Sequence, residues 1–153
     1  MTMDFSRFQV MPFAKGDTAD ETERLLRMSD DAVGYLHSHS WCPQIEHVLL
    51  AFGVGDVVAL FFVRFSAPLT SGDAGLWAVT GDVPDAYFVA DDASEARGAM
   101  EVYCRLMSDW VKAVETGSAM DNVFPVRASA TAENAHELCK RLTFIRDEII
   151  PTL

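Results

Sequence analysis

The sequence predicts an α+β fold: a four-stranded antiparallel meander with one N-terminal and two C-terminal helices packed on it. Two observations favour this fold. Apolar residues recur at helical spacing in one segment near the start of the chain and in two near its end, whereas the middle is rich in Val, Phe and Leu. No helical segment separates one predicted strand from the next, and strands joined without a crossover helix pair antiparallel.

The first helix is predicted from Ala19 to His37. Thr18-Ala19-Asp20-Glu21 has the form of a capping box, in which the Thr hydroxyl and the Glu carboxylate each bind a backbone amide at the helix start. Apolar residues follow at helical spacing, and the acidic residues of the first turn lie near the positive end of the helix dipole.

A hairpin of two strands, residues 45–53 and 57–66, is predicted next. The segment Gly53-Val54-Gly55-Asp56 interrupts the apolar run with turn-forming residues. Apolar residues occupy both alternating sets of positions in the second strand, so both of its faces should be covered. Helices could cover one face, and a further element or a second subunit would cover the other.

A second hairpin follows the loop at residues 67–74. Leu76 to Thr80 forms its first strand and Tyr87 to Ala90 its second. The connection Gly81-Asp82-Val83-Pro84-Asp85 contains Gly for unusual backbone angles and Pro to fix one, as turns require.

Two helices complete the chain. Asp92-Ala93-Ser94-Glu95 has a capping arrangement, and the helix behind it should end near Glu115, because Gly117 suits a left-handed position at the helix end. The final helix is predicted from Ala132 to Ile149 and is closed by Pro151.

Length and charge restrict the function. The 153 residues suit a single globular domain over 1–153. A net charge of −11, from 23 carboxylates against 12 basic groups, repels nucleic-acid phosphates and anionic membrane surfaces. The same charge favours a basic protein as the partner.

The cysteines and the opening segment predict a cytoplasmic protein. The three cysteines are widely spaced and contain no CxxC pair, which is typical of free thiols in a reducing compartment. The opening MTMDFSRFQV does not resemble a signal peptide. The most apolar segment, Val48 to Val63, is sixteen residues long and is interrupted by glycines, so no membrane span is expected.

One cluster has the residue types of a metal or nucleophile site. Three histidines and one cysteine, residue types that bind zinc, occur within eleven residues. His39 or His47 could also act as the base for a nucleophilic Cys42. Against zinc, the spacing matches no zinc finger. Against a nucleophile, acidic surroundings raise the pKa of a thiol. Histidines at a helix C-terminus also have a structural explanation, because an imidazolium is favourable near the negative end of the helix dipole. We therefore assign no catalytic residue, metal or cofactor, and keep a metal protein or enzyme as the alternative. The cluster consists of His37, His39, Cys42 and His47.

Negative charge is concentrated in the middle of the chain. No Lys or Arg occurs between Arg64 and Arg97, whereas six carboxylates do. Most of these acids occupy turn or helix-cap positions, where such residues commonly serve the backbone. Beyond that role they form a candidate surface of this chain for a basic partner. The predicted binding residues on this surface are Asp82, Asp85, Tyr87, Asp91 and Asp92.

The segment from Trp77 to Tyr87, W-A-V-x-G-D-V-P-x-x-Y, resembles a hairpin in small bacterial proteins grouped as a domain of unknown function. Those proteins share a Trp-x-Val-x-Gly-Asp-x-Pro-x-x-Tyr pattern, followed by an acidic residue and a long helix containing a Trp. The likeness covers about residues 75–112. It implies a fold and supplies no activity or catalytic residue.

Three hypotheses for the function follow. The first is a small acidic cytosolic module that binds a basic protein without catalysis, as an immunity protein binds a cationic toxin. The second is the metal protein or enzyme that uses the segment from His37 to His47. The third is a structural homodimer without a small ligand, motivated by the two-faced apolar hairpin.

Overall fold

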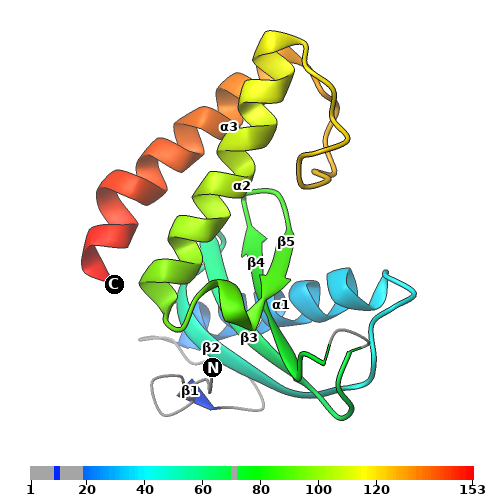
Figure 1. Cartoon of the computed structure of the whole chain (residues 1–153). Helices are drawn as coiled ribbons and strands as arrows, with labels where there is room; N and C mark the ends of the chain where they lie inside the picture. Colours follow the sequence, from blue (N-terminus) through cyan, green and yellow to red (C-terminus); the bar gives the residue numbers. More distant parts are fainter. Residues whose placement is uncertain (1–8, 11–18, 70–71) are drawn as a thin grey trace. The chain divides into compact units, whose positions relative to one another are not determined.

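The computed structural model describes residues 9–10, 19–69 and 72–153 (Figure 1). The chain divides into two compact units, Met1–Ala96 and Arg97–Leu153. The first unit contains the N-terminal helix and the sheet, and the second contains almost all of the two C-terminal helices. The single domain over 1–153 stays a prediction.

The elements confirm the predicted α+β meander. One N-terminal helix precedes four antiparallel strands, and two helices follow them. A two-residue strand, β1, pairs with β2 and extends the sheet to the order β1-β2-β3-β4-β5, which the sequence did not predict. The elements are β1 (Gln9–Val10), α1 (Ala19–His37), β2 (Ile45–Val54), β3 (Val58–Phe65), β4 (Gly75–Gly81), β5 (Ala86–Val89), α2 (Ala96–Thr116) and α3 (Ala132–Phe144).

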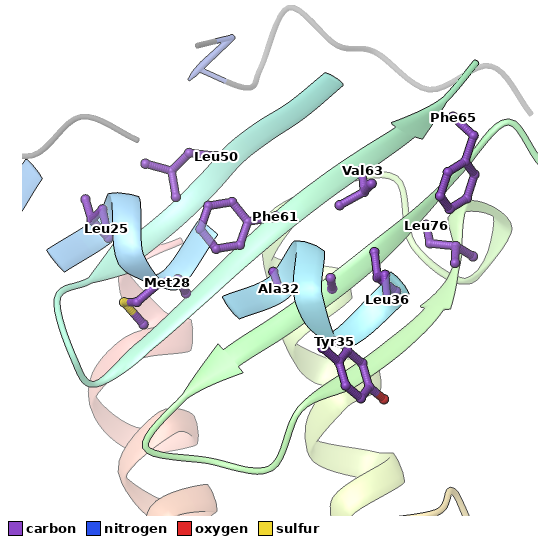
Figure 2. Packing of buried hydrophobic residues seen from close by; sticks show 12 residues of the cluster. Leu25, Met28, Ala32, Tyr35, Leu36, Leu50, Phe61, Val63, Phe65 and Leu76 are labelled. Atoms are coloured by element: carbon purple, nitrogen blue, oxygen red, sulfur yellow. The ribbon is translucent and has the colours of Figure 1, made fainter. Parts of the chain in front are cut away.

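Helix α1 covers one face of the sheet (Figure 2). Its buried residues recur every three or four positions, so they form one apolar stripe. Thr18, the proposed cap of this helix, lies outside the described residues. The stripe packs against alternate positions of β3 and β4, and full burial of each large side chain contributes about 1.5–3 kcal/mol. The cluster includes Leu25, Met28, Ala32, Tyr35 and Leu36 from α1 and Phe61, Val63, Leu76 and Ala78 from the strands.

The opposite face of the sheet is also buried. Every residue of β3 from Val58 to Val63 is buried, which confirms that both faces of this strand are covered. On this second face the rings of Phe62 and Trp77 meet edge to face, with centroids 5.1 Å apart. The Trp77 indole Nε1–H donates a hydrogen bond to the Ala93 carbonyl oxygen at 3.0 Å. Trp77 therefore ties the sheet to the segment that follows β5.

The second unit is built from α2 and α3. Helix α2 ends where Gly117 adopts a left-handed φ of 66°, as predicted, and the Ser118 N–H binds the Ala113 carbonyl oxygen at 2.9 Å. The Thr131 hydroxyl caps α3 by accepting from the Asn134 N–H at 3.1 Å. From η3 (Ile145–Ile149), the Arg146 guanidinium donates to Ser108 Oγ at 2.6 Å, which links the end of the chain to α2.

The last turns of the chain differ from the predicted helix over Ala132 to Ile149. The α-helical hydrogen bonding ends at Phe144, and η3 continues it with π-type turns before a final 3₁₀ turn, η4 (Ile150–Thr152). Pro151 lies inside η4, where the first turn of a helix tolerates proline. None of the helices in the described part of the chain is long and apolar enough to cross a membrane.

Candidate functional site

The β4–β5 connection is hydrogen-bonded to the β2–β3 turn in the first unit. Gly81, at the end of β4, has a φ of 138°, and a Cβ there would overlap the Val57 carbonyl oxygen and lie 2.8 Å from Val58 Cα. The next residue, Asp82, donates its backbone N–H to the Val57 carbonyl oxygen at 2.9 Å. Only glycine allows this close approach, so Gly81 brings the β4–β5 connection to the β2–β3 turn.

Helix α1 also contacts the β2–β3 turn. The Gly55 backbone N–H donates to Glu21 Oε1 at 2.8 Å, so this carboxylate serves the turn. Arg24 Nε lies 3.4 Å from Asp56 Oδ2. Asp56 itself has a φ of 63°, a left-handed conformation that aspartate tolerates better than most residues.

These contacts create an open depression of about 310 Å³. It contains one carboxylate from α1, one from the β2–β3 turn and one from the β4–β5 connection. Arg24 pairs with one of these carboxylates, Asp56. The surface is therefore suited to a cationic group. We call it the acidic depression; its lining residues are Met28, Asp31, Asp56, Gly81 and Asp82.

The predicted acidic residues are distributed over two ends of β5. Asp82 lines the acidic depression, and Asp85 lies half-buried just before β5 begins at Ala86. Asp91 and Asp92 are exposed in η2 (Ala90–Asp92), beyond the other end of β5.

The cap predicted for α2 differs in the structure. Asp92 ends η2, and α2 begins only at Ala96, so Asp92 is not in a position to cap that helix. The second strand of this hairpin is also one residue earlier than predicted, since Ala90 belongs to η2.

Tyr87 lies instead in a cluster of four rings. Its centroid is 4.9 Å from that of Trp41 and 5.1 Å from that of His39. The Tyr35 ring meets the His39 ring edge to face at 5.0 Å. Trp41 is 39% exposed, so the cluster reaches the surface. We call Tyr35, His39, Trp41 and Tyr87 the aromatic cluster; it unites a predicted binding residue, Tyr87, with a residue of the predicted metal cluster, His39.

His39 is oriented by the end of α1. Its Nδ1 lies 2.9 Å from the Tyr35 carbonyl oxygen. Because a carbonyl oxygen only accepts hydrogen bonds, this contact requires the proton on Nδ1. The His39 ring is thus fixed by the backbone and meets the Tyr35 and Tyr87 rings edge to face.

The other members of the predicted metal cluster lie in separate surroundings. His37 is the exposed last residue of α1, and His47, on β2, lies 3.4 Å from the Glu46 carboxylate. The Cys42 thiol donates to the Pro43 carbonyl oxygen at 3.4 Å, and burial raises its pKa. Within the described residues, no three His, Cys, Asp or Glu side chains are grouped to hold a metal ion.

The thiols should differ sharply in reactivity, because only the thiolate is nucleophilic. Cys139 is exposed, whereas burial raises the pKa of Cys104 to about 11. Under native conditions at mildly alkaline pH, we expect alkylation of Cys139 first, Cys42 more slowly, and Cys104 only on unfolding. Timed alkylation followed by peptide mass spectrometry measures this order. Modification of Cys104 in the folded protein at the rate of Cys139 would contradict the assigned burial.

Comparison with known proteins identifies no relative. No protein-family model, no curated protein and no solved structure matches the chain. The likeness of the Trp77 to Tyr87 hairpin to proteins of unknown function stays a prediction. The function is therefore inferred from the charge, geometry and exposure of the acidic depression and the aromatic cluster.

Proposed function

We propose that the protein is a non-enzymatic binding module whose acidic depression receives cationic side chains of a basic partner protein. The observation that carries this proposal is the convergence of Asp31, Asp56 and Asp82 from three separate elements on one open surface. The net charge of −11 supports it, because a strongly negative protein attracts basic surfaces over a distance. Neutralisation of a cationic toxin, as by an immunity protein, is one activity of this kind.

Exposed ion pairs of this type are individually weak. Each contributes about 0.2–1 kcal/mol, so useful affinity requires several cations of the partner to bind at once. Salt screens such pairs, with a Debye length of about 8 Å at physiological ionic strength. Binding to the acidic depression should therefore weaken steeply as salt is added.

A defined basic probe tests this proposal without knowledge of the natural partner. A fluorescent peptide of alternating glycine and lysine is titrated with the protein at low and high salt, and binding is followed by anisotropy. The variant Asp31→Asn/Asp82→Asn should bind about three- to tenfold more weakly than the unmodified protein at low salt. The loss should shrink at high salt, because screening has already weakened the pairs.

The matched control is Asp91→Asn/Asp92→Asn. It removes the same formal charge from two residues that the sequence also predicted to bind, but which are exposed in η2, outside the acidic depression. We expect it to weaken peptide binding less than about twofold, through net charge alone. Equal losses in the two double variants would show that binding follows net charge, and would overturn the proposed role of the depression.

A further inference from the structure

Two segments of the chain connect the acidic depression with the aromatic cluster. On α1, Asp31 and Tyr35 are four residues apart, so they are neighbours on one side of the helix. Asp31 lines the depression, whereas Tyr35 contacts His39 and Tyr87 in the cluster. Figure 2 shows the Tyr35 ring at the edge of the α1 core, with its hydroxyl turned away from the apolar side chains. Tyr35 therefore belongs both to the core beneath α1 and to the aromatic cluster.

The segment formed by the β4–β5 connection and β5 likewise carries both a carboxylate of the depression and a ring of the cluster. Asp82 lines the depression, and five residues later Tyr87 on β5 joins the cluster. Asp85, half-buried, lies between the two in sequence. Two separate segments thus each carry a carboxylate of the depression and a ring of the cluster, four residues apart on α1 and five residues apart along the β4–β5 segment.

The ring geometry identifies the chemistry that this surface suits. Centroids of neighbouring rings are 4.9–6.1 Å apart, so the rings pack against one another and leave no cage between them for a bulky quaternary ammonium. The planes of neighbouring rings are inclined by 38–86° to one another, so the cluster offers individual ring faces, and its most exposed ring is Trp41. A planar guanidinium stacks on an exposed ring face of this kind, whereas the compact, strongly hydrated ammonium of lysine does so less well.

We propose that the aromatic cluster docks an arginine side chain of the basic partner, next to the cation held in the acidic depression. This proposal rests on the proposed function and adds the partner's residue type: an arginine stacked on Trp41, beside Tyr87. Charge complementarity favours this occupant over an apolar segment, since the neighbouring lining residues Asp31 and Asp82 carry negative charge. A cation over an exposed ring contributes enough to give roughly a two- to fivefold preference for arginine.

Tryptophan fluorescence gives a local readout of this contact. Trp77 and Trp110 are buried, so Trp41 is the most exposed of the three tryptophans. Two peptides of equal charge are compared, one of alternating glycine and arginine and one of alternating glycine and lysine. With the unmodified protein, the arginine peptide should bind roughly two- to fivefold more tightly and change the Trp41 emission more at saturation.

Three variants assign the preference to the cluster. Trp41→Leu should bind the two peptides equally, whereas Trp41→Tyr, which keeps a ring, should retain part of the preference. Phe144→Leu is the matched control, because it removes an exposed aromatic ring outside the cluster and should leave the preference intact. Circular dichroism and thermal unfolding confirm that each variant is folded before binding is compared.

The possible results separate this inference from the proposed function. If neither peptide binds, the proposed function fails, and the inference fails with it. If both peptides bind with equal affinity, and Asp31→Asn/Asp82→Asn weakens both, the proposed function stands and the arginine site is overturned. Tighter binding of an uncharged glycine–leucine peptide than of the arginine peptide would assign the cluster to apolar docking and would also overturn it.

Discussion

Replacement of Trp77 by alanine is expected to lower the free energy of unfolding by about 3–5 kcal/mol. The side chain is fully buried, its ring meets Phe62 edge to face, and its indole N–H binds the Ala93 carbonyl oxygen. Removal leaves a cavity and an unsatisfied carbonyl group in the same place. Since small domains are stable by about 5–15 kcal/mol, urea unfolding should show a large shift of the midpoint.

Two further variants separate the contributions at Trp77. Trp77→Phe keeps most of the ring but loses the hydrogen bond to Ala93, so its loss should be intermediate. Trp41→Ala removes the same side chain from a position that is 39% exposed, so its loss of stability should be clearly smaller than that of Trp77→Ala. A Trp77→Ala loss as small as that of Trp41→Ala would contradict the assigned burial and packing.

The variant Gly81→Ala is expected to lose about 2–3 kcal/mol of stability and to disrupt the acidic depression. A Cβ at this position would overlap the Val57 carbonyl oxygen, and the φ of 138° is unfavourable for any side chain. The β4–β5 connection must then move away from the β2–β3 turn, and Asp82 moves with it. Urea unfolding measures the first effect, and titration with the glycine–lysine peptide measures the second.

Gly72→Ala is the matched control for Gly81→Ala. Gly72 also has a positive φ, 93°, but a Cβ there would have no atom of the described residues within 4 Å, its chain neighbours apart. Its substitution should carry only the backbone cost, about 1 kcal/mol, and should leave peptide binding unchanged. Equal losses of stability for the two variants would show that the contact between Gly81 and Val57 is unimportant.

Local signals in the sequence were sufficient for most of the fold. The bounds of α1 follow from apolar periodicity and the acidic first turn, and the structure confirms Ala19–His37. The turn residues at Gly53 to Asp56 divided the long apolar run into β2 and β3. Strand β1 was missed because two residues carry no periodic pattern, and the π-type turns of η3 were missed because they keep the helical spacing of apolar residues.

The candidate site depends on contacts that local patterns do not encode. Asp82 was singled out from its turn, but Asp31 and Asp56 join it through tertiary contacts, among them the backbone approach at Gly81 and the bond from Gly55 to Glu21. The extent of β5 does separate Asp82 from Asp91. With a rise of about 3.3 Å per residue, strand length alone places them apart, so the sequence contained this signal.

The aromatic cluster combines residues that the sequence had assigned to different hypotheses. Tyr87 was predicted from the hairpin, and His39 from the candidate metal cluster. The contact between them requires that the end of α1 lie beside β5. Tyr35 provides that link, since it belongs to the core stripe of α1 and also contacts both rings.

The most direct measurement for the central claim is a set of amide chemical shifts recorded by NMR while the glycine–lysine peptide is added at low salt. If the acidic depression receives cations, the largest and most salt-sensitive shifts will occur at Asp31, Asp56, Gly81 and Asp82. The amides of Asp91 and Asp92 will change little. Shifts spread evenly over the acidic residues of the chain, or concentrated in η2, would contradict a built binding site at the depression.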